Sequence, residues 1–158
     1  MINEHNYRDF FMLEALQMAF KASNCNEVPV GAIIVKEGKI IGSGYNKVIK
    51  KNSSLFHAEM IAIYQASQAL NNYRLVGTQI YSTLEPCHMC AKAIVDARID
   101  HLFFGALEPK TGAIRSIDQF LDRHDLNHKV HYSGGHLADR SSLLLKNFFQ
   151  SRRIKKRH

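Results

Sequence analysis

Hydrophobic residues recur along the chain with two different periods, and each change of period marks a predicted element. In residues 7–22 the apolar side chains recur at the spacing of one helix face, which predicts an amphipathic helix. This face carries Tyr7, Phe11, Met18 and Ala22, with Phe10, Leu13 and Ala15 beside them. The β-branched run 28–35 and the run 39–45, joined by Glu37-Gly38, predict a β-hairpin.

The rest of the chain continues as alternating helical and strand patterns. They predict a helix over 57–70, a strand over 78–83, a helix over 87–97, a strand over 101–105, a short helix over 117–121, a strand over 130–132 and a last helix over 137–151. This order places helices on both faces of a mixed sheet, because a hairpin is antiparallel and βαβ crossovers are parallel. We therefore predict a three-layer α/β/α domain with a mixed five-stranded sheet.

Three glycines, Gly31, Gly42 and Gly44, lie inside the predicted hairpin strands. Glycine weakens strand pairing unless something must approach the backbone closely. A β-bulge and a bound ligand both agree with this pattern.

The composition is that of an ordinary globular protein. With 158 residues, 46% hydrophobic and 22% charged, the chain has the size and character of one domain, which excludes a disordered or low-complexity protein. Its three cysteines cannot all pair with one another, which favours a reducing compartment. No apolar run reaches the roughly 18 to 20 residues that span a bilayer, so we expect a soluble, cytoplasmic protein without membrane contact.

The positive charge is concentrated at the C-terminal end. The net charge is +7, and residues 152–158 contain five lysine or arginine side chains and no acidic one. We predict a single domain over 1–151 and a basic tail over 152–158 that extends the last helix. Such a tail binds a polyanion or only keeps the chain in solution, and charge alone favours the second interpretation.

Cys87-His88-Met89-Cys90 is a C-x-x-C motif at a predicted helix start, so its two sulfur atoms share one face. A helix N-terminus lowers thiol pKa values and thereby favours the thiolates that bind metal. A structural zinc site needs four ligands, usually from a second such pair, and the chain has none. With His57 as third ligand one position stays open, which is the arrangement of catalytic zinc.

Glu59, two residues after His57, is then the candidate proton carrier. Positions i and i+2 point about 200° apart on an ideal helix, so the two side chains converge only around an ion beyond the helix start. Each motif also has an ordinary alternative, because a lone C-x-x-C is often redox-active or simply buried.

Taken together, His57-Ala58-Glu59 and Pro86-Cys87-His88-Met89-Cys90 match the H-x-E and P-C-x-x-C signature of zinc nucleobase deaminases. Over nearly its whole length the chain resembles the bacterial tRNA-specific adenosine deaminases of the TadA type. Besides the signature, the resemblance is carried by Glu27–Ala32, Gly42-x-Gly44-x-Asn46, Asn72–Leu75, Thr83–Cys87, Phe104–Ala106, Lys110–Ala113 and Asn127-His128.

The resemblance implies a cytidine deaminase-like fold and hydrolytic deamination of adenosine to inosine at the wobble position of the tRNA anticodon. It implies one Zn²⁺ per subunit on His57, Cys87 and Cys90, with Glu59 moving protons between water and the base. It further implies that Asn46 bonds the flipped base, although a simple turn residue is the alternative for Asn46. The remaining residues that it implies for the base pocket are Pro29, Val30, Ala58 and the backbone of Glu85.

The resemblance also implies a homodimer and RNA contacts outside the pocket, with an arginine tRNA as the expected partner. The residues that it implies for RNA binding are Glu108, Lys110, Phe149, Arg152 and Arg153. Of the adjacent phenylalanines, Phe148 is expected in the core and Phe149 towards RNA. Two positions depart from the family pattern, Glu108 in place of aspartate and His136 in place of a branched apolar residue, and we expect His136 to loosen the packing before the last helix.

Two other functions share the metal motif. A deaminase of a free base or nucleoside, such as guanine or cytosine, would use the same zinc and glutamate. A non-catalytic RNA-binding subunit would keep the zinc for folding, but such a subunit does not require Glu59.

Overall fold

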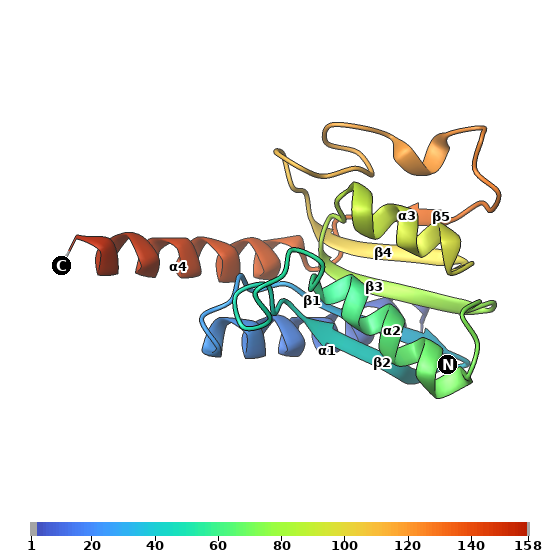
Figure 1. The fold of residues 1–158 in the computed structure, drawn as a ribbon, viewed down its shortest axis with the longest axis horizontal. Coiled ribbons are helices and arrows are strands. Elements are labelled where there is room, and N and C mark those ends of the chain that lie inside the picture. The colour runs from blue at the N-terminus through green and yellow to red at the C-terminus, as the bar shows by residue number, and fades with distance from the viewer. Residues whose placement is uncertain (1–2, 158) are drawn as a thin grey trace.

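The computed structural model describes residues 3–157, in which helices cover both faces of one sheet (Figure 1). The strands are β1 (Gly31–Lys36), β2 (Lys39–Tyr45), β3 (Thr78–Leu84), β4 (His101–Ala106) and β5 (His131–Ser133). The helices are α1 (Glu4–Asn24), α2 (Ala58–Leu70), α3 (His88–Asp96) and α4 (Ala138–Lys156), with a 3₁₀ helix η1 at Phe120–Asp122. Met1, Ile2 and His158 lie outside the described residues.

The sheet has the order β2-β1-β3-β4-β5. Strand β1 is antiparallel to both β2 and β3, whereas β4 is parallel to β3 and to β5. Helices α2 and α3 cover one face, and α1 and α4 cover the other. The predicted three-layer α/β/α architecture with a mixed sheet is confirmed.

The hairpin glycines allow helices to lie directly on the sheet. A Cβ atom at Gly42 or Gly44 would collide with backbone carbonyl oxygens of α2, and one at Gly31 would collide with the backbone of α1. The register of β1 and β2 also shifts between Ile34 and Val35, so a bulge is present as well. Close helix packing therefore accounts for these glycines without a ligand, and it fixes the start of α2 against the end of β2.

Helix α1 buries a face that only partly coincides with the predicted one. Its core side chains are Phe11, Met12, Ala15, Leu16, Ala19 and Ala22. Tyr7 is 47% exposed and Phe10 55% exposed, and Met18 is only partly buried. Phe11, Ala15 and Ala22 are buried as predicted, and the ring of Phe11 contacts Tyr81 of β3, which in turn stacks on Phe103 of β4.

Several predicted ends also move. Helices α2 and α3 each begin one residue later than predicted, because His57 and Cys87 are N-cap residues with extended backbones. The short helix lies at Phe120–Asp122 and not at 117–121. Helix α4 continues five residues past Ser151 to Lys156 and projects beyond the sheet (Figure 1). Within residues 3–157 no helix combines the length and the apolar character that a membrane crossing requires.

Candidate active site

The starts of α2 and α3 bring His57, Cys87 and Cys90 together at one end of the sheet. Nδ1 of His57 lies 3.6 Å from Sγ of Cys87 and 3.5 Å from Sγ of Cys90. All three ligand atoms lie within 4.8 Å of one another. Within residues 3–157, these are the His, Cys, Asp or Glu side chains that lie close enough together, in a group of at least three, to hold one metal ion. Cys25 is exposed and is not part of the group.

This geometry fits zinc. Bonds of about 2.3 Å to sulfur and about 2.0 Å to nitrogen at tetrahedral angles place N and S about 3.5 Å apart. The two measured distances of 3.6 and 3.5 Å agree with that value. Two thiol sulfurs and one imidazole nitrogen are also the donor types that zinc prefers. The three predicted ligands therefore can hold one zinc ion and leave a fourth position open.

The two cysteines are electrostatically unequal. A hydrogen bond from the Cys90 thiol, assisted by His57, lowers the pKa of Cys87 to about 3. The same contact with Cys87, together with burial, raises the pKa of Cys90. The hydrogen bond with Cys87 raises the pKa of His57 above its ordinary value. The lowered pKa of Cys87 favours its thiolate form, which is the form that binds metal.

Glu59 lies beside these ligands in the first turn of α2 and is only 4% exposed. Its Oε1 accepts a hydrogen bond from the Ser82 hydroxyl at 3.0 Å, and its Oε2 lies 3.4 Å from Sγ of Cys90. Burial raises the pKa of Glu59. Because His57 is an N-cap with an extended backbone, its side chain escapes the helical spacing that would have pointed it away from Glu59.

A cavity of about 340 Å³ opens onto this cluster. His57, Glu59 and Cys87 line it together with Val28, Val30, Leu84, Asn46 and Arg152. Its volume lies in the range of small-molecule sites. Larger hollows beside α4 and α3 do not contain the ligand atoms.

The predicted pocket residues are only partly brought to this cavity. Val30, Asn46 and Glu85 line it, whereas Pro29 is buried and the neighbouring Val28 lies in the wall. Ala58 is completely buried, and its N–H donates to Oδ1 of Asn46 at 2.8 Å. This bond caps α2, whose N-cap side chain makes no capping bond. The Ala58 N–H is therefore engaged by Asn46, and Ala58 is not among the residues that line the cavity.

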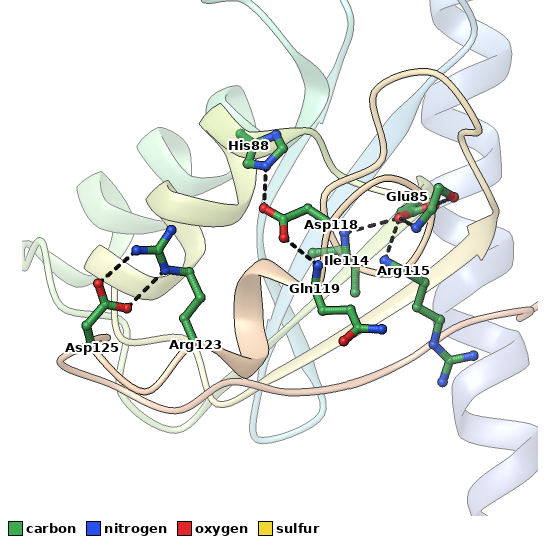
Figure 2. A network of polar contacts seen from close by, with 9 residues as sticks. Glu85, His88, Ile114, Arg115, Asp118, Gln119, Arg123 and Asp125 are labelled. Atoms are coloured by element: carbon green, nitrogen blue, oxygen red, sulfur yellow. Dashed lines mark hydrogen bonds and ion pairs between the residues drawn. The ribbon is translucent and has the colours of Figure 1, made fainter.

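Glu85 uses its side chain to hold a loop, a role that the sequence did not indicate. Its carboxylate accepts N–H bonds from Glu108, Ile114, Arg115 and Ser116 at 2.8 to 3.1 Å, and it also accepts from the Ser116 hydroxyl. Figure 2 shows the bonds from Ile114 and Arg115 reaching Glu85 from this loop. Burial favours the neutral form, but the bonds outweigh it and lower the pKa of Glu85. Gly112 makes room, because a Cβ there would collide with the carboxylate.

Glu27 holds the opposite wall in the same way. It is 2% exposed, and its carboxylate accepts N–H bonds from Ile49 at 2.9 Å and Lys50 at 2.8 Å. It thereby anchors the loop between β2 and α2 at the cavity. Sequence reasoning missed this residue, although it opens the family motif Glu27–Ala32, because spacing does not reveal which carboxylates are buried.

The residues predicted for RNA binding lie around the cavity and on α4. Glu108 is half-buried and Lys110 exposed, in the loop that Glu85 holds. Phe149 is 44% exposed whereas Phe148 is 8% exposed, as expected. Arg152 donates to the Asn26 carbonyl at 2.9 Å and lines the cavity. Arg153 is exposed near the end of α4.

His136 does not loosen the segment before α4. Its ring packs edge-on against Phe103, and its Nε2 lies 2.6 Å from the Ser133 hydroxyl. Burial lowers the pKa of His136, so the ring fills the place of an apolar residue in its neutral form. The expected packing defect is absent at this position.

The fold and the site define a zinc-binding deaminase, and comparison with known proteins agrees. Residues 5–106 match the cytidine and deoxycytidylate deaminase zinc-binding region. The tRNA-specific adenosine deaminase of Haemophilus influenzae is 44% identical over 147 residues, which cover 92% of this chain and 85% of that protein. The enzyme of the same name from Aquifex aeolicus is 44% identical and covers 87% of this chain and 91% of its own length. The chain belongs to the family of tRNA-specific adenosine deaminases.

Solved structures support the same assignment. A structure from a study of A-to-I editing by tRNA:A34 deaminases at the wobble position superposes with a TM-score of 0.83 at 39% identity, covering 86% of this chain and 99% of that one. A guanine deaminase from Nitrosomonas europaea superposes with a TM-score of 0.75 at 20% identity, which shows a shared fold alone. The predicted family and the cytidine deaminase-like fold are confirmed.

Proposed function

We propose that this protein hydrolytically deaminates adenosine to inosine at wobble position 34 of a tRNA anticodon, with one zinc ion per subunit. The observation that carries the proposal is the cluster of His57, Cys87 and Cys90 with zinc-like spacing, placed beside the buried Glu59 at one cavity. The family assignment supports tRNA as the substrate.

The protein residues would move the protons of the reaction. His57, Cys87 and Cys90 would hold the zinc ion, which would supply Lewis-acid chemistry that makes water easier to deprotonate near neutral pH. Glu59 accepts a proton from the attacking water and delivers it to N1 of the adenine as oxygen adds to C6. The second water proton, now on the C6 hydroxyl, is passed by Glu59 to the amino group; the C6–N bond breaks, a C6=O bond forms and ammonia leaves. Water and adenosine thus give inosine and ammonia.

Asn46 would orient the flipped base. Because its Oδ1 accepts from Ala58 N–H, its amide nitrogen is left to donate towards the cavity. A purine ring nitrogen is an acceptor of the matching kind. Val30 and Leu84 supply apolar walls for the base, and an anticodon loop offers a base that leaves its stack at low cost.

The RNA would extend from the cavity onto α4 and the loop near Lys110. Arg152 stands at the cavity, Arg153 follows it, and the exposed Phe149 offers a stacking surface on the same helix. This arrangement favours the polyanion interpretation of the basic tail over 152–158. An arginine tRNA with adenosine at the wobble position is the proposed partner.

We further infer a cytoplasmic homodimer, in which a second copy completes the RNA surface. Large exposed apolar side chains support an interface, among them Phe20 at 56% and Tyr64 at 68% exposure. A cytoplasmic site agrees with the thiolate ligands, which require a reducing environment. Sedimentation equilibrium with and without tRNA tests the dimer, and a monomer under both conditions would refute it.

The direct test incubates the zinc-loaded protein with an arginine tRNA transcript carrying A34, and scores inosine and ammonia. A transcript with G34, free adenosine, cytidine and guanine run in parallel, with Glu59→Ala as the inactive control. Formation of inosine only at position 34, with no turnover of the free bases and nucleosides, would support the proposal. Turnover of a free base would assign a small-molecule deaminase, and zinc binding with no turnover of any substrate would assign a non-catalytic subunit.

A further inference from the structure

Ser82 of β3 is a completely buried hydroxyl directly beneath Glu59. It lies just before the Thr83–Cys87 motif and is not part of the metal signature. Its Oγ is 3.0 Å from Oε1 of Glu59 and 2.8 Å from the backbone oxygen of Leu84. The Ser82 hydroxyl therefore contacts Oε1 of Glu59, whereas the other carboxylate oxygen, Oε2, faces the metal ligand Cys90.

The geometry gives this hydroxyl two acceptors. Serine has one hydrogen to donate and two lone pairs that accept. Its hydrogen can point to Oε1 of Glu59, or it can point to the Leu84 oxygen while Oγ accepts from a protonated carboxyl group. The contact between Ser82 and Glu59 is therefore kept whether or not Glu59 carries a proton.

The other side-chain contact of Glu59, with Cys90, requires that Cys90 carries its thiol proton. Oε2 lies 3.4 Å from Sγ of Cys90, which can donate only as a thiol. A cysteine that binds metal does so as a thiolate and has no proton to give. When Cys90 binds zinc, Ser82 is therefore the side chain within residues 3–157 that still donates a hydrogen bond to the Glu59 carboxylate.

We propose that Ser82 is a positioning residue, which holds Oε1 of Glu59 so that Oε2 faces the metal ligands. This inference rests on the proposed function of Glu59 as proton carrier. A glutamate side chain has several rotatable bonds, and Ser82 restrains its far end from the sheet, whereas α2 fixes only its Cα. Misplacement of a reacting group by about 1 Å can cost about 100-fold in rate.

The test compares Ser82→Ala with Ser82→Thr in the zinc-loaded full chain. Ser82→Ala should lower kcat by roughly 10- to 100-fold, with zinc stoichiometry unchanged and KM for the tRNA within about twofold of wild type, because no RNA contact is lost. Ser82→Thr keeps the hydroxyl and should restore most of kcat. Ser141→Ala is the matched control, since it removes an equally buried hydroxyl that has no hydrogen-bond partner, and it should leave kcat unchanged.

A crystal structure of zinc-loaded Ser82→Ala gives a readout that is independent of turnover. We expect Glu59 to occupy more than one rotamer there and a single rotamer in Ser141→Ala. Wild-type kcat in Ser82→Ala, an equal loss in Ser141→Ala, or a single unchanged Glu59 rotamer would overturn the proposal. If the wild-type protein does not deaminate tRNA, the proposed function fails, and the rotamer comparison still decides whether Ser82 positions Glu59.

Discussion

Glu59 and Glu85 are both almost completely buried, at 4% and 2% exposure, but their surroundings act on them in opposite directions. Glu59 accepts one hydroxyl bond and has a weak thiol contact, and burial raises its pKa. Glu85 accepts from four backbone N–H groups and one hydroxyl, and these bonds lower its pKa.

The number of donors therefore separates a carboxylate that exchanges a proton from one that holds a structure. A buried carboxylate with few donors is costly to ionise, so its pKa rises towards neutral pH, where the group can serve both as proton acceptor and as proton donor. A buried carboxylate surrounded by N–H groups stays ionised and acts as a fixed anchor. By this comparison, Glu59 at the start of α2 takes part in proton transfer, and Glu85 at the end of β3 keeps its loop ordered.

The largest expected effect is the loss of turnover in Glu59→Gln. The amide has nearly the same shape but cannot carry the proton, so the single-turnover rate on A34 tRNA should fall about 10²- to 10⁴-fold. Zinc content, measured by atomic emission, should remain stoichiometric. A variant that loses zinc together with activity would contradict the separation of Glu59 from the ligands.

Glu85→Gln should act on stability more than on chemistry. In the glutamine an NH₂ group replaces one of the two accepting oxygens, so backbone N–H groups of the loop would face another donor and lose their hydrogen bonds. We therefore expect a loss of about 3 kcal/mol in the free energy of unfolding, measured with urea. Hydrogen exchange should rise in residues 107–119, which the carboxylate holds. The matched control is Glu37→Gln on the exposed hairpin turn, which should change neither quantity. Equal stabilities of the two variants would contradict the anchor.

Gly112→Ala tests the space around the same anchor. The added methyl group would overlap the Glu85 carboxylate, and the loop would have to shift. We expect a smaller loss of about 2 kcal/mol in unfolding free energy. Ser54→Ala, in an exposed part of the other loop, serves as a control. A fully stable Gly112→Ala would show that the loop is not closely fitted to Glu85.

The smallest effects are the pH dependences of stability in the metal-free protein. The lowered pKa of Glu85 gives stability that is complete above about pH 4.5 and is lost as the pH falls through its folded value. The raised pKa of Glu59 has the opposite sign, so its contribution is complete below about pH 4.5 and is lost as the pH rises. Relative to wild type, Glu59→Gln should become more stable towards neutral pH, and the deficit of Glu85→Gln should shrink in acid. Parallel stability profiles would contradict both assignments.

The sequence predicted the three layers, the succession of helices and strands along the chain, and the metal ligands. It could do so because the hydrophobic period and the motif spacing are local properties of the sequence. It predicted only part of the buried face of α1, since the cluster of Phe11, Tyr81 and Phe103 joins residues far apart in the chain.

The site was predictable as a list of residue types and not as a set of contacts. His57, Cys87 and Cys90 follow from spacing, and their convergence follows from the N-cap positions only once α2 and α3 are placed on the sheet. Ser82 and Glu27 carry no signal of their own. Their roles depend on burial beside partners more than 20 residues away in the sequence.

The most direct test of this comparison is a carbon-13 NMR titration of the glutamate carboxyl groups in the metal-free protein, assigned with Glu59→Gln and Glu85→Gln. We predict that Glu59 titrates above the ordinary glutamate value of 4.5 and that Glu85 titrates below it. Equal titration of the two groups, or the reverse order, would contradict the claim that hydrogen-bond donors decide which buried carboxylate serves the chemistry.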